Sequence, residues 1–164
     1  MISDGVNKLL AIGLNDDVLS SEISCYEQYK EQPKDIVINI RYGLTTDQKC
    51  EAIFNYLTQN VVYRLDKVGD QYIKTPARLL SDGYGDCKSL AMFINCCLHC
   101  LDIPHIFRFV NFDGGSQYTH VYAVAIDENG NEIILDPCEK DDDGVILYNF
   151  ARPYVKKKDF RYER

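Results

Sequence analysis

The sequence lacks an apolar run long enough to cross a bilayer, and its first apolar stretch, from Leu9 to Leu14, is only six residues long. Asp4 stands where a secretory leader would carry basic residues, and no cleavage site of small residues follows. These absences predict a protein without a leader or membrane contact, located in the cytoplasm.

The chain also lacks linkers, low-complexity runs and any internal repeat with a period of about 20 to 50 residues. With 164 residues, of which 46% are hydrophobic and 12% aromatic, it can bury roughly 70% of the surface of its unfolded chain. We therefore expect a single domain over residues 1–164.

Positive charge is scarce outside the C-terminal end. The net charge is −7, and residues 152–164 hold six of the 18 Lys and Arg but only two of the 25 acidic residues, so the rest of the chain carries −11. An acidic body argues against nucleic-acid binding. The segment 152–164 is expected to be a basic C-terminal tail, either solvated or docking an acidic protein partner.

The seven cysteines do not indicate disulfide pairing, because their number is odd and Cys96, Cys97 and Cys100 crowd one apolar segment. Free thiols indicate a reducing, intracellular setting. Cys96, His99 and Cys100 have the helical spacing to share a metal, but one continuous helix offers no fourth ligand, and packing is the preferred interpretation. The acidic run 139–144 lacks the closing glutamate of a calcium loop. No metal or cofactor is therefore expected.

Helical periodicity marks two long segments. Residues 45–64 begin with Thr45 and Gln48 at the spacing of a capping box, and a second helix follows Cys87. Their apolar stripes are Cys50, Ile53, Phe54, Leu57 and Val61 in the first helix, and Leu90, Ala91, Ile94, Cys97, Leu98 and Leu101 in the second.

Other patterns are shorter. Residues 1–34 favour one or two short helices, and residues 74–80 favour a short helix with Pro76 near its first turn. Residues 35–43 alternate isoleucines like a half-buried strand. After residue 104 the pattern changes to strands, expected at 105–112, 118–127, 132–137 and 144–150. Helices followed by an antiparallel sheet indicate the α+β class.

A thiol lies at the start of the second helix, in the stretch SDGYGDCKSLAMF. At this position of Cys87, unpaired backbone N–H groups and the helix dipole favour an anion and ease thiolate formation. Tyr84, between the two glycines, either lines a cleft or is an exposed loop residue. Asp86 and Lys88 are expected to shape and solvate the helix start.

A nucleophilic cysteine needs a base and a group that orients the base. His120 opens the stretch HVYAVAI, and Asp136 closes EIIL on the next strand. A two-residue turn between these strands would put the two side chains on opposite faces. A three-residue loop with Gly130 in the left-handed conformation would make them diagonal neighbours on one face. A triad of Cys87, His120 and Asp136 therefore predicts the longer loop.

These motifs, G-D-C at a helix start, H-V-Y on a strand and L-D-P after the next strand, resemble the transglutaminase-like superfamily, within the papain-like group of cysteine-peptidase folds. The similarity spans residues 46–139. It implies an α+β core in which N-terminal helices, with the nucleophile at a helix N-terminus, pack on an antiparallel sheet. It also implies that Cys87 is the nucleophile, His120 the general base and acid, and Asp136 the orienting group. The family often has H-A-W where this chain has H-V-Y.

The resemblance implies acyl transfer on amide bonds of a peptide or protein substrate. The backbone N–H of Cys87 would donate to the oxyanion, and Gln71 is the candidate second donor. With water as acceptor the protein is a cysteine peptidase or amidase, the preferred hypothesis. The alternatives are a cross-linking transglutaminase or deamidase, a non-catalytic interaction module of the same fold, and a metal-binding module built on the Cys96–Cys100 cluster.

Overall fold

The computed structural model of the chain describes residues 5–10, 13–40, 44–67 and 70–163. The helices are α1 (Asp16–Tyr29), α2 (Lys34–Val37), the 3₁₀ helix η1 (Ile38–Ile40), α3 (Thr46–Asn60), α4 (Pro76–Asp82) and α5 (Cys87–Cys100). The strands are β1 (Val6–Leu10), β2 (Val62–Tyr63), β3 (Asp70–Lys74), β4 (Tyr84–Gly85), β5 (His105–Asn111), β6 (His120–Ile126), β7 (Glu132–Leu135) and β8 (Lys156–Tyr162). This mixture of helices and sheet agrees with the expected α+β class.

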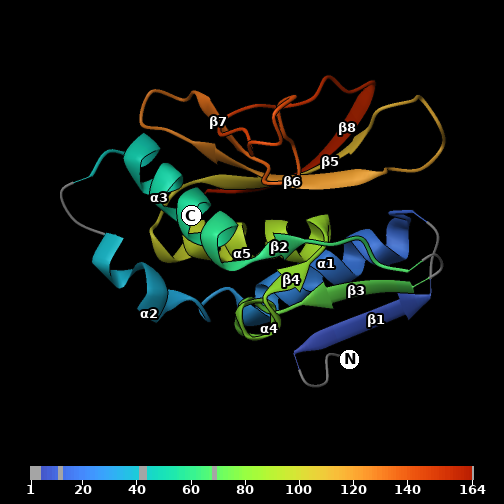
Figure 1. The fold of residues 1–164 in the computed structure, drawn as a ribbon, viewed down its shortest axis with the longest axis horizontal. Helices are drawn as coiled ribbons and strands as arrows, with labels where there is room; N and C mark the ends of the chain where they lie inside the picture. Colours follow the sequence, from blue (N-terminus) through green and yellow to red (C-terminus); the bar gives the residue numbers. More distant parts are fainter. Residues whose placement is uncertain (1–4, 11–12, 41–43, 68–69, 164) are drawn as a thin grey trace.

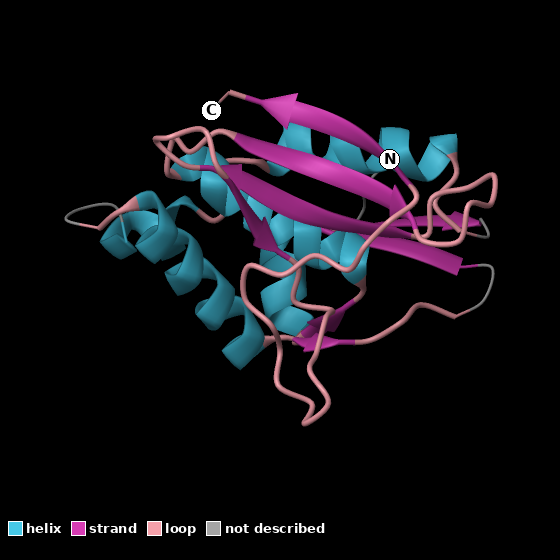
Figure 2. Ribbon diagram, turned by 90° about the horizontal axis from the view of Figure 1, so that it is seen from above, coloured by secondary structure: helices cyan, strands magenta, loops and turns pink. Residues whose placement is uncertain are grey.

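The central helix α5 lies between a four-stranded antiparallel sheet, of order β7-β6-β5-β8, and a layer that contains α1 and the β1-β3 pair (Figure 1). Figure 2 shows that the helices cover one face of this sheet. Every residue of α5 except His99 is buried. The helix is apolar on nearly all sides, so it packs against its neighbours all round. This packing holds its first residue, Cys87, in place.

Two apolar cores flank α5, one toward α3 and one toward α1. The predicted stripes of both long helices are fully buried, so the helical periodicity is confirmed. The capping box is confirmed as well: the Thr45 hydroxyl accepts the Gln48 N–H, and the Gln48 side chain accepts the Thr45 N–H at 2.9 Å. The short helix with Pro76 in its first turn is also present as α4.

The β6–β7 hairpin has the predicted three-residue loop. Ala123 pairs with Leu135, and the Asp127 N–H donates to the Asn131 carbonyl at 2.9 Å. Gly130 has a φ of +82°, the left-handed conformation that this loop requires. The register puts the positions of His120 and Asp136 on the same face of the sheet.

The segment expected as a strand at 35–43 is helical instead. Residues 34–40 form α2 and η1, and Ile38 is 49% exposed. Pro33 precedes α2, and its carbonyl accepts the Ile36 N–H at 2.9 Å, which starts a helical turn before any strand can pair. Residues 41–43 of that prediction lie outside the described residues.

Two further strand expectations are corrected. Within residues 1–34, where one or two short helices were expected, the helix α1 is present, but Val6–Leu10 forms β1 by pairing with β3, about 65 residues later in the chain. Residues 144–150 do not form a strand, and only Ile146 makes an isolated bridge, to Lys140. Val6–Leu10 is a strand because a distant segment pairs with it, whereas residues 144–150 pair only through the Ile146 bridge.

The basic C-terminal segment is not a solvated tail, because Lys156–Tyr162 pairs with β5 along its full length as the edge strand β8 (Figure 2). Phe160 and Tyr162 pack against the apolar core on the α1 side. Lysines on an exposed edge discourage pairing with a second chain, which explains their presence in a strand.

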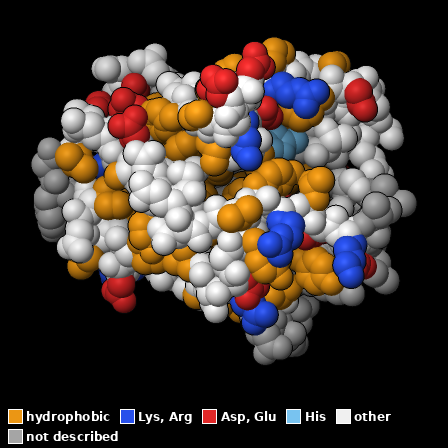
Figure 3. Space-filling view, in the orientation of Figure 1, with side chains coloured by type: hydrophobic (Ala, Val, Ile, Leu, Met, Phe, Trp, Pro, Cys, Tyr) orange, Lys and Arg blue, Asp and Glu red, His pale blue; other side chains and the backbone are white. Residues whose placement is uncertain are grey.

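The surface mixes both signs of charge. Figure 3 shows acidic and basic side chains interspersed with apolar ones on one face of the molecule. Among the described residues, no helix combines the length and the apolar character that crossing a bilayer requires.

Candidate active site

The turn from α4 to α5 places Cys87 at the first position of α5. Gly83 ends α4 with a φ of +75°, and the Asp86 side chain caps α5 by accepting the Lys88 N–H at 3.1 Å. A Cβ atom on Gly85 would lie 2.6 Å from a methyl carbon of Leu79 and 3.1 Å from the Ser89 Cβ, so glycine lets the chain pass close to both helices. The Cys87 side chain emerges 8% exposed at the end of the central helix.

The hairpin brings the other two predicted residues together. His120 is the first residue of β6 and Asp136 directly follows β7, and His120 Nε2 lies 2.7 Å from Asp136 Oδ2. Both residues are buried, with exposed fractions of 7% and 1%. The predicted diagonal pair is therefore a direct hydrogen bond.

His120 also interacts electrostatically with the Cys87 side chain, so one imidazole is coupled to both the thiol and the carboxylate. Because Nε2 contacts Asp136, Nδ1 is the nitrogen left for Cys87. Burial alone would lower the pKa of His120, but the interactions with Asp136 and Cys87 outweigh it and raise the pKa to about 10. The imidazole is thus held as a cation at neutral pH, which suits a partner thiolate.

A buried charge network beneath the nucleophile was not predicted from the sequence. Lys88, expected to solvate the helix start, is 1% exposed and binds Asp86 and, at 3.2 Å, Asp66. Burial raises the pKa of Asp86 to about 6 despite the Lys88 cation. Glu22 of α1 lies within electrostatic reach of Lys88 and Cys87, and both its carboxylate oxygens are buried without a hydrogen-bond partner among the described residues. Burial raises its pKa well above the usual value, which favours the protonated carboxyl.

A small cavity of about 120 Å³ opens at the nucleophile, and both Cys87 and Gln71 line it. Gln71 lies on β3, far from the hairpin in sequence, so the fold brings the candidate second oxyanion donor to the cavity of the thiol. Tyr63 also lines it. The role of Gln71 remains a prediction.

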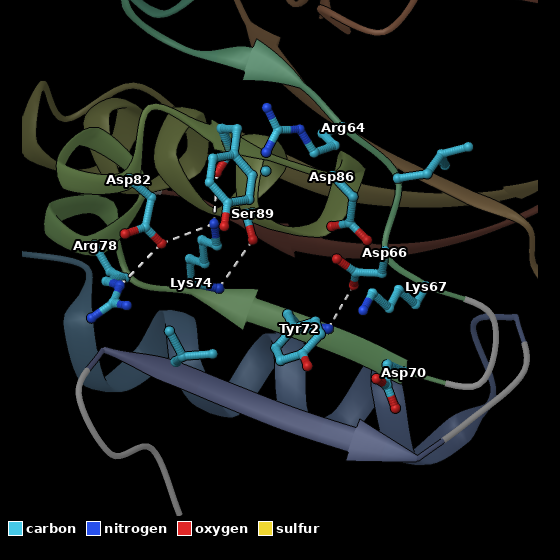
Figure 4. A pocket seen from close by; sticks show the side chains of 14 residues that line it. Arg64, Asp66, Lys67, Asp70, Tyr72, Lys74, Arg78, Asp82, Asp86 and Ser89 are labelled. Carbon is cyan, nitrogen blue, oxygen red and sulfur yellow. Dashed lines mark hydrogen bonds and ion pairs between the residues drawn. The ribbon is translucent and has the colours of Figure 1, made fainter.

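A larger cavity of about 910 Å³ adjoins the small one, because Leu65, Asp66 and Asp86 line both. Charges of both signs line it: Lys74 binds Asp82 at 2.9 Å, as Figure 4 shows. No feature of the sequence pattern indicated this cavity, since its lining comes from several separate segments.

Tyr84 lines the larger cavity, and its role there remains a prediction. The side chain is 37% exposed, and two cations lie against its ring. Lys74 Nζ is 3.6 Å and the Arg64 guanidinium carbon 4.1 Å from the ring centroid. Such cation–π contacts orient the ring at the cavity wall.

The cluster on α5 is not assembled as a metal site. Cys96 is completely buried, and His99 contacts Glu31 at 2.6 Å. Within the part of the chain that the structure describes, Cys96, His99 and Cys100 do not form a group of converging metal ligands.

No protein-family model and no curated protein sequence matches this chain. Two solved structures share its fold. A candidate protease from Parabacteroides distasonis is 13% identical, with a TM-score of 0.58 over 71% of this chain and 26% of its own. A candidate cysteine protease from Cytophaga hutchinsonii is 15% identical, with a TM-score of 0.51 over 91% of this chain and 56% of its own.

These similarities support the papain-like fold group for this chain. They do not distinguish the transglutaminase-like superfamily within that group. The chain spans about a quarter and just over half of the two proteins it resembles, so the similarity concerns one part of each.

Proposed function

We propose that the protein is a cysteine hydrolase that cleaves amide bonds through Cys87, His120 and Asp136, with a core of the transglutaminase-like type. The observation that carries the proposal is the position of His120, whose Nε2 lies 2.7 Å from the buried Asp136 carboxylate and whose imidazole interacts electrostatically with the Cys87 thiol. Structural packing alone does not require three ionisable side chains in a row beside a cavity.

The proposed reaction starts from the Cys87 thiolate paired with the His120 imidazolium. The thiolate attacks the amide carbonyl, and the oxyanion is stabilised by the backbone N–H at the first turn of α5 and by the Gln71 side chain. His120 then protonates the leaving amine, and a thioester remains on Cys87. The neutral imidazole next deprotonates a water molecule, which hydrolyses the thioester. The acid product is released, and the pair of Cys87 thiolate and His120 imidazolium is restored.

The adjoining cavities support a peptide as the substrate. Leu65 is 76% exposed and lines both cavities, so it offers an apolar contact next to the nucleophile. The larger cavity adds carboxylates and cations in several positions, which suits an extended chain with polar side chains. Water is the favoured acceptor, and transfer to an amine is the alternative outcome of the same thioester.

The decisive experiment treats the intact protein with a panel of amide and peptide probes that carry thiol-reactive groups, followed by mass spectrometry of the adduct. We expect selective labelling of Cys87 and hydrolysis of at least one peptide in a mixed library. Cys87→Ala should abolish both, whereas Cys100→Ser, at the other end of α5, should affect neither because serine can keep the bond to the Lys30 carbonyl.

Adding an amine to the reaction distinguishes the acceptors, since a cross-linking enzyme would incorporate the amine into the product. Uniform slow labelling of all seven cysteines, with no hydrolysis, would contradict the proposal and favour a non-catalytic interaction module.

A further inference from the structure

A second thiol adjoins the histidine–carboxylate pair. Cys138 follows Asp136 by two residues, and its backbone N–H donates to Asp136 Oδ1 at 3.2 Å. A nitrogen of His120, a carboxylate oxygen of Asp136 and Sγ of Cys138 all lie within 4.8 Å of one another. In the described part of the chain, this is the one place where three such donor atoms converge.

The donor set fits zinc. Imidazole nitrogen, carboxylate oxygen and thiolate sulfur are the three ligand types of Zn²⁺, with bond lengths of roughly 2.0–2.3 Å. Hard cations such as Mg²⁺ and Ca²⁺ prefer oxygen ligands alone. Tetrahedral ligands at those bond lengths are roughly 3.3–3.8 Å apart, so small side-chain rotations would suffice. His120 Nε2 and Asp136 Oδ2, now 2.7 Å apart, would separate by roughly 0.6–0.7 Å.

The three candidate ligands differ in burial. Cys138 is only partly buried, unlike His120 and Asp136, so a water in the fourth position would approach from its side. Zinc bound by three protein side chains usually keeps a water in its fourth position. Cys87 contacts His120 but does not belong to the converging group, so the nucleophile lies outside it.

We propose that His120, Asp136 and Cys138 form an inhibitory zinc site built into the catalytic pair. The metal takes the place of the hydrogen bond between His120 Nε2 and Asp136, and the Cys138 thiol loses its proton when it binds. The imidazole is then fixed to the metal and can no longer shuttle a proton for Cys87. The metal binding stands on geometry alone, whereas the inhibition rests on the proposed hydrolase function.

The binding test uses the full chain carrying Cys87→Ala, so it is independent of any activity. Co²⁺ serves as a spectroscopic probe for the zinc site, because a cobalt–thiolate bond gives a near-ultraviolet charge-transfer band. We expect this band in Cys87→Ala and its loss when Cys138→Ser is added. The same added Cys138→Ser change should lower the Zn²⁺ affinity, measured by competition with a chelating dye, by more than roughly 10–100-fold. A loss of roughly 10–100-fold is what removal of an outer-sphere partner alone would cause. Cys100→Ser in the same background is the matched control and should leave both unchanged.

A second measurement needs no ligand substitution. Zn²⁺ should protect Cys138 of the Cys87→Ala protein from alkylation, as detected by mass spectrometry. A cobalt band that survives Cys138→Ser but disappears with Cys87→Ala would overturn the proposal, because the metal would then bind the nucleophile. The absence of any band, or equal affinity in all variants together with unprotected Cys138, would overturn it too.

Inhibition is measured separately, on the protein with Cys87 intact. Zn²⁺ should reduce peptide hydrolysis reversibly, a chelator should restore it, and Cys138→Ser should need at least tenfold more Zn²⁺ for the same loss. If no substrate is turned over but the cobalt band appears as expected, the hydrolase proposal fails while the metal site stands. Zn²⁺ inhibition that is identical in the Cys138→Ser protein would refute the inhibitory role.

Discussion

Two buried histidines begin adjacent strands of the main sheet and have opposite protonation behaviour. His105 opens β5 and His120 opens β6, at opposite ends of the antiparallel pair. The exposed fractions are 0% and 7%, so burial disfavours the charged form of both. Yet burial lowers the pKa of His105 to about 4, whereas the pKa of His120 is raised to about 10.

The side chains and backbone groups that contact each histidine account for the difference in pKa. His105 Nδ1 lies 2.7 Å from the Ile103 carbonyl, and its Nε2 lies 2.6 Å from the Tyr26 hydroxyl, so one nitrogen donates and the other accepts. Neither partner is charged. His120 instead contacts a carboxylate and a thiol. Burial therefore makes a histidine neutral or cationic according to the charge beside it, and only the second arrangement prepares it for proton transfer.

The largest expected effect comes from removing the imidazole of the charged site. His120→Gln keeps a donor for Asp136 but cannot accept a proton from Cys87, so turnover should fall by roughly 10⁴–10⁶-fold. Peptide hydrolysis and the alkylation rate of Cys87 measure the loss. His99→Gln is the matched control and should retain turnover, because His99 contacts Glu31 at the far end of α5. Activity within tenfold of wild type would remove His120 from the mechanism.

Replacing the carboxylate makes the His120 site resemble the His105 site. Asp136→Asn keeps the shape and an acceptor oxygen but loses the charge, so the pKa of His120 should fall, as an imidazole NMR titration would reveal. Turnover should drop by roughly 10–10³-fold, less than for His120→Gln, because asparagine fills this role in some cysteine peptidases. The Asp102→Asn protein, altered beyond the other end of α5, should keep normal turnover. An unchanged pKa and near-normal turnover would demote Asp136 to a turn residue.

Breaking the neutral site should affect stability rather than turnover. His105→Phe fills similar space but leaves the Tyr26 hydroxyl and the Ile103 carbonyl unpaired, so the free energy of unfolding should fall by roughly 2–4 kcal/mol. Denaturant titration measures it. Combining His105→Phe with Tyr26→Phe should cost less than the sum of the two single changes. A loss of turnover without a loss of stability would contradict the structural role.

The contrast between the histidines also shows how far sequence analysis reaches. His120 could be singled out because its partner Asp136 is only sixteen residues away in one hairpin, where strand register and the Gly130 loop are local properties. His105 gave no such signal, since its partner Tyr26 is 79 residues away on α1. The helices and the hairpin were predictable for the same reason, as their periodicity and capping are written in adjacent residues.

Features that depend on distant pairing were missed or misassigned. The strand β1 exists because β3 lies beside it, and β8 exists because the exposed edge of β5 accepts it. The ion pair of Lys88 with Asp66 likewise joins segments whose proximity only the fold creates. The sequence shows which residues these are, but it does not show which other residues they contact.

The smallest expected effect is the pH dependence of stability that the neutral His105 imposes. The folded-state pKa of about 4 is lower than the unfolded value of roughly 6.5, so the unfolded chain binds more protons between these limits. The stabilisation is complete above about pH 6.5, declines as the pH falls, and is gone below about pH 4. Between about pH 8 and pH 5 this single group should cost about 2 kcal/mol of unfolding free energy.

Since carboxylates titrate over part of the same range, the comparison with His105→Phe isolates the contribution of the imidazole. Urea titrations at several pH values should give a shallower decline for the variant than for the wild type. Parallel declines would mean that His105 accepts a proton in the folded state as readily as in the unfolded chain, and the contrast with His120 would then lie in function alone.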